Sequence, residues 1–448
     1  MTPRGTLVRV LEWVGMVKDG TSAAAIEARA TVSGGLDSRA SWKAAWLTLA
    51  ILSVSYGSPL LIVVGMKTMQ AELGTERSVL ALAGALVWVG TGAGGILMGW
   101  LADRIGVRCT VTIGACMIAG GLALSSTGTI WALYVGHGLM IGLFGNGGVY
   151  PPLLVYVSRW FERRRGAAIA LISSGQYVAG VAWPSLFERA IDGIGWQMAM
   201  LAFSAAVLVL ILPATLMLKP APGQPIPLSL RPSSGARTQA EGRLRTRRVG
   251  GLHPNVAQAL LCLAGFFCCI PMSLPSSHLV AFCGDIGIKP THGAAMLSVM
   301  LGAAFLARQA WGALADRIGG LRTVMAGSAC QAVAIGCFLL TQDEAGLFAI
   351  AAAFGLGFSG IIPSYAVAIR DLFPAAEASW RIPLTLFTAM SGMAFGSWFA
   401  GALYDHFGYY APAFGVSVVF NLLNLAVVGF LVLRLAGARQ AAVWSAAE

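Results

Sequence analysis

The sequence contains few charged residues. Lysine, arginine, aspartate and glutamate together make up 11% of its 448 residues, whereas 57% are hydrophobic. Soluble domains carry about 25% charged residues, so this composition argues against a soluble globular protein. Mean hydropathy is +0.75, and uncharged runs long enough to cross a hydrocarbon core of about 30 Å recur along the chain. The composition therefore predicts an integral membrane protein.

Several chemical signatures are also missing. No Gly-x4-Gly-Lys-Ser/Thr loop occurs, so we do not expect ATP to drive the protein. The eight cysteines lie in or at the ends of the apolar runs and lack the CxxC spacing of metal or redox sites. We therefore expect no cofactor and no metal ion. No nucleophile–base arrangement indicates an enzyme.

Twelve apolar runs have the length of transmembrane helices. Their predicted bounds are 44–66, 78–101, 109–127, 130–157, 166–187, 196–218, 255–283, 292–315, 323–341, 346–369, 382–403 and 409–433. The 56 glycines suit this interpretation because small residues let membrane helices approach closely. The fold class that we expect is an all-α membrane protein of two six-helix bundles.

The segments between the runs define the expected domain organisation. Residues 219–254 are rich in proline, serine, glycine and arginine, a composition that does not bury a core and is typical of a flexible linker. We predict bundles at 44–218 and 255–435, with tails at 1–43 and 436–448.

Basic residues are distributed unevenly between alternate loops. The side that carries both termini and the linker collects 25 of the 30 lysines and arginines. The opposite loops contain only Lys67, Arg77, Arg189 and Lys289. This is the positive-inside pattern with both termini in the cytoplasm. The net charge of +11 therefore reflects topology, and we expect a lipid bilayer rather than nucleic acid around the protein.

One charged turn occurs twice, 213 positions apart. The first copy follows the second run and the other copy follows the eighth. Each acid can accept hydrogen bonds at the start of the next helix, and each arginine can pair with acids or helix C-termini. Such a cluster can hold two helices in one conformation and release them in another. We expect a conformational latch, as opposed to a simple solvated turn, at Gly99, Asp103, Arg104, Gly106 and Arg108 and at Gly312, Asp316, Arg317, Gly319 and Arg322.

The Gly-x-Leu-Ala-Asp-Arg-x-Gly turn resembles the signature of the major facilitator superfamily. The resemblance covers residues 44–435. It implies two pseudo-symmetric six-helix bundles around a central cavity that opens alternately to the two sides of the membrane.

A second stretch resembles one group within that superfamily. Residues 156–168 form an aromatic and basic turn, and Ser173-Ser174-Gly175 follows in the fifth run. Together with Tyr56-Gly57-Ser58-Pro59, this is similar to the monocarboxylate and oxalate–formate type carriers. The antiporter signature of multidrug carriers is matched less well, because Ala179-Gly180 stands where Gly-Pro is expected.

Arg308 is the most costly residue to place in a membrane. It lies eight residues before Asp316, about 12 Å along a helix and close to the bilayer midplane. An arginine at that depth costs about 2.5–3.5 kcal/mol or more unless it faces water, a partner or a ligand. Its planar guanidinium matches a carboxylate. We expect Arg308 to bind an anionic substrate; the alternative is an arginine held by helix carbonyls.

The monocarboxylate carriers share the arginine at the position of Arg308 but differ from this chain at other charged positions. Monocarboxylate carriers place an arginine four residues before the glycine of helix 8, as Arg308 precedes Gly312 here. They also have an aspartate where this chain has Ala304, and a lysine inside helix 1, whereas Lys43 and Lys67 lie at its ends. A single fixed positive charge favours a monoanion.

Histidines and polar residues within the runs are further candidates. No carboxylate within the runs indicates proton coupling. A histidine can take that role because its pKa lies near neutral pH, and His278 is a better candidate than His137. Membrane helices hide polar side chains from lipid, so each faces the cavity or another helix. The substrate-binding candidates besides Arg308 are Tyr56, Asn146, Gln176, His278, Gln309 and Tyr365.

The sequence thus favours a monomeric secondary active or facilitative transporter of the inner membrane. We expect its substrate to be a small organic anion, a monocarboxylate, with a proton as a candidate co-substrate. One alternative is an efflux carrier for drugs or other amphiphiles. An alternative of another class is a membrane sensor that transports nothing and contacts a partner through residues 219–254.

Overall fold

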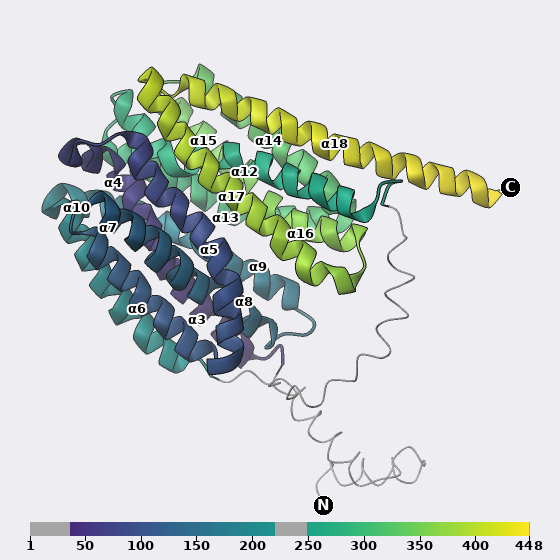
Figure 1. Ribbon diagram of the computed structural model, residues 1–448, viewed down its shortest axis with the longest axis horizontal. Coiled ribbons are helices and arrows are strands. Elements are labelled where there is room, and N and C mark those ends of the chain that lie inside the picture. Colours follow the sequence, from purple (N-terminus) through teal and green to yellow (C-terminus); the bar gives the residue numbers. More distant parts are fainter. Residues whose placement is uncertain (1–35, 220–248, 448) are drawn as a thin grey trace, which may run out of the picture.

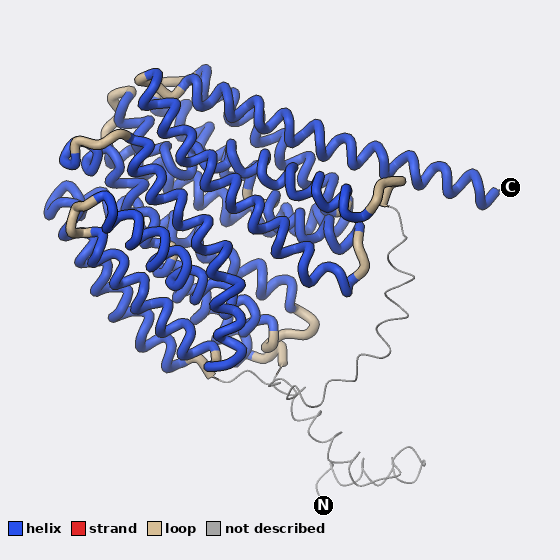
Figure 2. The backbone as a smooth tube through the Cα atoms, viewed as in Figure 1, coloured by secondary structure: helices blue, strands red, loops and turns tan. Residues whose placement is uncertain are grey.

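The computed structural model describes residues 36–219 and 249–447. This part of the chain is helical apart from short turns, and it contains no strand (Figure 2). Most of the expected N-terminal tail and linker lies outside the described residues.

The first half of the described chain forms the helices expected from its apolar runs, with bounds that differ from the predicted ones by a few residues. Their bounds are α3 Arg39–Ser55, α4 Gly57–Leu73, α5 Arg77–Ile105, α6 Val107–Ser125, α7 Ile130–Tyr134, η1 Val135–Asn146, α8 Gly147–Ser158, α9 Arg165–Ser173 and α10 Gly175–Met217.

The second half repeats this arrangement. Its helices are α12 Pro254–Asp285, α13 Pro290–Ile318, α14 Gly320–Leu340, α15 Glu344–Phe358, α16 Ile361–Leu372, α17 Ala375–Phe407 and α18 Ala411–Ala447.

Eleven helical stretches of the described chain are long and apolar enough to cross a membrane. One of them, Gly166–Met217, has 52 residues, far more than a single crossing requires. It is interrupted at Gly195, whose φ of 79° and ψ of 159° are not helical. The break separates two spans, and the total of twelve agrees with the sequence prediction.

The helices form two bundles that lie side by side (Figure 1). Helices α3–α10 enclose one hydrophobic core and helices α12–α18 another. The bundles meet where α5 packs against α17 and α10 packs against α13. Within the first bundle, α5 and η1 approach closely at Gly94, because a Cβ at this position would overlap the Leu143 carbonyl oxygen.

The two charged turns have the same backbone geometry. Gly106 adopts φ 86° and ψ 156°, and Gly319 adopts φ 85° and ψ 155°. Residues with a Cβ rarely adopt these positive φ angles, which explains why both copies of the motif have glycine at this position. The repeated conformation supports the internal symmetry inferred from sequence. We call the face of the molecule that carries these two turns the motif face.

Three predicted spans depart from regular α-helix for one or two residues, although the backbone angles there stay close to helical. These local breaks lie at Tyr56 between α3 and α4, at Ser174 between α9 and α10, and at Ser359 and Gly360 between α15 and α16. The fourth span also contains a π-helical stretch, Val135–Asn146. Irregular backbone is tolerated at membrane depth only where it is buried in protein or lines a cavity.

Candidate functional site

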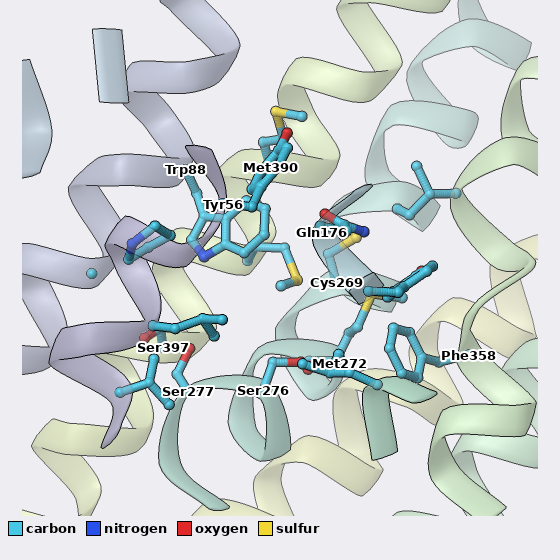
Figure 3. Close-up of a pocket in the computed structure, with 18 of the residues that line it drawn as sticks. Tyr56, Trp88, Gln176, Cys269, Met272, Ser276, Ser277, Phe358, Met390 and Ser397 are labelled. Atoms are coloured by element: carbon cyan, nitrogen blue, oxygen red, sulfur yellow. The ribbon is translucent and has the colours of Figure 1, made fainter. Parts of the chain in front are cut away.

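A cavity of about 170 Å³ lies between the two bundles. Helices of both bundles line it, and the breaks in the first, fifth and tenth spans supply Tyr56, Ser173 and Phe358. Figure 3 shows Tyr56, Trp88 and Met390 on one side of this space, with Met272 and Phe358 on another. The interrupted helices and the cavity therefore coincide.

Arg308 of α13 is the only charged residue among the described residues that line this cavity. Its Nη2 donates a hydrogen bond to Ser173 Oγ at 3.1 Å. The guanidinium carbon lies 5.3 Å from the ring centroid of Tyr177, a cation–π distance. These contacts occupy one of five N–H donors and come from the opposite bundle. No described carboxylate forms an ion pair with Arg308, so its charge is available to an anionic ligand.

Three of the candidates from sequence meet in the cavity lining: Tyr56, Gln176 and Arg308. Gln309, which follows Arg308 on the same helix, is exposed and lies outside the lining. A step of about 100° around a helix separates consecutive side chains. The arginine therefore faces the cavity and the glutamine does not.

Asn146 and Tyr365 are buried in helix contacts rather than at the cavity. Asn146 Oδ1 accepts a hydrogen bond from Ser55 Oγ at 2.6 Å. The Tyr365 hydroxyl donates to Asn424 Oδ1 at 3.1 Å. Both side chains are hidden from lipid, as expected, but by a neighbouring helix.

The two histidines are also buried away from the lining. His137 Nδ1 lies 3.0 Å from Ser125 Oγ, within the first bundle. His278 has both ring nitrogens in hydrogen-bond contact, Nδ1 with the Tyr410 hydroxyl and Nε2 with the Ser397 carbonyl oxygen, each at 2.8 Å. Ser397 and the neighbouring Ser277 both line the cavity. His278 is thus one residue removed from the site.

Among the described residues, the first charged turn makes contacts only within its own bundle. Asp103 forms an ion pair with Arg159 at 3.6 Å, and the two side chains are 72% and 38% exposed. The guanidinium of Arg104 lies over the Trp100 ring at 3.8 Å. Arg108 Nε donates to the Leu218 carbonyl oxygen. On the motif face, these contacts join α5 to the end of α8 and α6 to the end of α10.

The second charged turn is organised differently. Asp316, Arg317 and Arg322 are exposed, and no ion pair of theirs occurs among the described residues. The acid at the start of α14 is Asp371, whose Oδ2 accepts a hydrogen bond from the Gly320 N–H at 3.1 Å. Asp371 therefore stabilises the N-terminus of α14, the position we expected Asp316 to serve.

The opposite face, which we call the lock face, carries an ion-pair network that no sequence motif indicates. Arg77, at the start of α5, forms a two-pronged ion pair with Asp285, at the end of α12. Its side chain is 3% exposed, its guanidinium lies 3.7 Å above the Tyr404 ring, and Nη1 donates to the Tyr410 hydroxyl at 3.2 Å. One arginine of the first bundle is therefore enclosed by groups of the second.

Two further contacts join the bundles at this face. Lys67 Nζ donates to the Gly284 carbonyl oxygen at 2.7 Å and lies 3.4 Å from Asp285 Oδ1. The Asp405 carboxylate accepts the backbone N–H groups of Arg77 and Ser78, both at 2.8 Å. A carboxylate from the second bundle thus caps the N-terminus of α5. We refer to Lys67, Arg77, Asp285, Asp405 and Tyr410 together as the interbundle lock.

The Major Facilitator Superfamily sequence profile matches residues 45–282 and 261–445. The chain belongs to this superfamily. Among curated relatives, it is 28% identical over 331 residues to monocarboxylate transporter 13 of Bos taurus, covering 73% of this chain and 74% of that protein. It is 22% identical over 342 residues to the MFS-type transporter pynF of Aspergillus niger, covering 75% of each. The resemblance to monocarboxylate carriers is confirmed.

Solved structures agree on the fold. The peptide transporter POT in complex with sulfate has a TM-score of 0.68 and 16% identity, covering 90% of this chain and 98% of that one. The nucleoside transporter NupG has a TM-score of 0.65 and 13% identity, covering 86% and 99%. This superfamily transporter is therefore a multi-pass membrane protein of two six-helix bundles.

Proposed function

We propose that this protein is a monomeric secondary active or facilitative transporter that moves a small monocarboxylate across the inner membrane by alternating access. The observation that carries the proposal is Arg308, the one charged group in the described cavity lining. A guanidinium stays protonated and binds a carboxylate through parallel hydrogen bonds. One such group balances one negative charge, which favours a monoanion.

The contacts between bundles support alternating access. Arg77 and Asp285 hold the lock face closed, while the ion pair that the first charged turn makes on the motif face stays within one bundle. The positive-inside pattern assigns the motif face to the cytoplasm. The structure then corresponds to a state in which the cavity is closed toward the outside, and release of the lock would admit substrate from that side.

The apolar lining of the cavity favours the second candidate, efflux of drugs or other amphiphiles. Most of its lining residues are aliphatic, aromatic or methionine side chains. A carrier for neutral amphiphiles would use this surface without Arg308. Dependence on the charge of Arg308 therefore separates the two functions.

The test is uptake of radiolabelled monocarboxylates into proteoliposomes that contain the full-length protein. We expect Arg308→Ala to abolish uptake and Arg308→Lys to retain a fraction of it, since lysine keeps the charge but loses the planar fork. Arg370→Ala is the matched control, because Arg370 is exposed at the end of α16 and does not line the cavity. Unchanged uptake by Arg308→Ala, or uptake of neutral amphiphiles alone, would contradict the proposal.

A further inference from the structure

The cavity is longer than a two- or three-carbon acid requires. On the first span, its lining runs from Tyr56 to Met66, ten residues or about 15 Å of helix. On α12 it runs from Cys269 to Ser277, about 12 Å. A carboxylate held at one point leaves most of this length for the rest of the substrate.

Arg308 lies toward one end of this length. On α13 the lining contains Leu301 and Arg308, and Arg308 is about 10 Å further from the lock face. At the other end, Met66 precedes the lock residue Lys67 in sequence. A bound carboxylate therefore sits toward the motif face, and the body of the substrate extends toward the lock.

The surface along this length suits an aromatic ring. Trp88 and Phe358 line it, and aromatic pairs gain about 0.5–1.5 kcal/mol beyond area burial. Methionines such as Met272 and Met390 lie among them (Figure 3). Thioethers adapt their shape and contact ring edges favourably. A short hydrophilic acid such as lactate has no ring or long carbon chain to place against this surface.

We propose that the preferred substrate is an arylalkanoate, a monocarboxylate whose acid group is joined by a short carbon chain to an aromatic ring. The inference rests on the proposed function, because Arg308 holds the acid group. The ring occupies the aromatic and methionine-lined length between Arg308 and the lock. The acid supplies orientation and the ring supplies most of the binding free energy.

One glycine leaves space for the ring. Gly84 of α5 lines the cavity, and a Cβ built at this position meets no atom within 4 Å. A leucine side chain at this position would therefore extend into open space rather than into a neighbouring helix. Gly84→Leu fills the proposed ring site while leaving Arg308 in place.

The first experiment measures binding to the full-length protein in detergent by isothermal titration calorimetry. The ligands are 3-phenylpropionate, propionate, lactate and the neutral 3-phenylpropanol. We expect 3-phenylpropionate to bind about 10- to 100-fold more tightly than propionate or lactate, the gain from burying a phenyl-sized group. We expect 3-phenylpropanol to bind at least about tenfold more weakly than 3-phenylpropionate, because it lacks the charge that pairs with Arg308.

The second experiment repeats these titrations with Gly84→Leu. Binding of 3-phenylpropionate should weaken at least about tenfold, the loss of a buried ring site, whereas binding of propionate should change less than about threefold. Gly415→Leu is the matched control, since Gly415 also has no atom near its Cβ and lies outside the cavity. It should leave both affinities unchanged.

The outcomes separate this inference from the proposed function. If propionate and lactate bind as tightly as 3-phenylpropionate, or if Gly84→Leu weakens all acids equally, the arylalkanoate assignment is overturned while carboxylate transport stands. If 3-phenylpropanol binds as tightly as 3-phenylpropionate and Arg308→Ala changes neither, both proposals are overturned.

Discussion

The two faces of the molecule use charge in opposite ways. On the motif face, the ion pair between Asp103 and Arg159 is exposed and joins helices of one bundle. On the lock face, Arg77 is enclosed, and its partner Asp285 belongs to the other bundle. The conspicuous repeated motif thus contributes local order in this state, while residues that no motif indicates hold the bundles together.

This difference bears on which face resists opening. Exposed ion pairs contribute about 0–1 kcal/mol, whereas removing one partner of a buried pair costs about 3–5 kcal/mol. Arg77 is nearly inaccessible, and Asp285 is partly exposed at 17%. The free energy that the lock contributes therefore lies between these two limits and exceeds that of the ion pair on the motif face. Separating the bundles at the lock face is therefore the costly step.

The largest effect is expected from Arg77→Gln. It removes the ion pair with Asp285 and the contact with Tyr410, so the lock face should open. A cysteine introduced as Met66→Cys should then react at least about tenfold faster with a membrane-impermeant maleimide, consistent with loss of a largely buried pair. Uptake should fall because return to the closed state is disfavoured.

The control for this prediction is Asp103→Asn on the motif face, tested in the same Met66→Cys background. It removes an exposed pair within one bundle and should leave the maleimide rate unchanged. Equal acceleration by both substitutions would show that the two faces do not differ as described.

His278→Phe is expected to have an intermediate effect. It removes the hydrogen bonds that connect Ser397, at the cavity, to Tyr410, in the lock. Leaving such partners unsatisfied costs about 1–3 kcal/mol, so we expect uptake to slow about fivefold or more with little change in substrate affinity. Tyr410→Phe should slow uptake similarly, and the double variant should add little. A loss of affinity without a loss of maximal rate would instead place His278 in direct contact with substrate.

Asp316→Asn is expected to have a smaller effect. Asp316 is exposed, and no partner of it occurs in the described part of the chain. We expect the maximal rate of uptake to change by less than about fivefold, the range of an exposed pair, with substrate affinity unchanged. Kinetic analysis of uptake separates the two quantities, and a loss of affinity alone would contradict this view of the second turn.

The smallest effect concerns Asp37, on the motif face. Its carboxylate accepts the backbone N–H groups of Glu162, Arg163 and Arg164 at 2.9–3.1 Å. The Arg163 bond is the largest cause that holds the pKa of Asp37 below its ordinary 3.8, although burial opposes the shift. A lowered pKa means that the contact stabilises the loop fully above about pH 3.8 and is lost as pH falls through the pKa of the folded state.

Amide hydrogen exchange of residues 162–164 tests this contact. At neutral pH, Asp37→Asn should accelerate exchange in this loop, and lowering the pH below the pKa that Asp37 has in the folded state should abolish the difference between variant and parent. The lock-face amides of Arg77 and Ser78 serve as the internal control, because Asp405 rather than Asp37 accepts their hydrogen bonds. Equal exchange in variant and parent at neutral pH would contradict the assignment.

The helices were predictable because uncharged length alone specifies a span. Arg308 was predictable for a related reason, since a charge far from any helix end must face water, a partner or a ligand. The breaks at Tyr56, Ser174 and Ser359 were not predictable, because none of these residues forces a helix to end.

The interbundle lock was not predictable either. Arg77 and Asp285 lie at the ends of predicted spans, where charged residues usually meet water, and their pairing depends on how two distant segments meet. The sequence also did not distinguish cavity-lining polar residues from those buried between helices, such as Asn146, Tyr365 and His278. The sequence indicates that they avoid lipid, but the rotation of each helix decides between the cavity and a neighbouring helix.

The central claim is that a carboxylate bound at Arg308 shifts the two bundles between two states. Distances between spin labels, measured across each face, test this claim most directly. One pair replaces Glu76 and Lys289 near the lock face, and the other replaces Glu162 and Arg370 near the motif face; all four residues are exposed. Addition of 3-phenylpropionate to protein in nanodiscs should widen the lock-face distribution and narrow that of the motif face, and Arg308→Ala should abolish both responses. Identical responses in Arg308→Ala, or no response at either face in protein that transports the acid, would contradict the account.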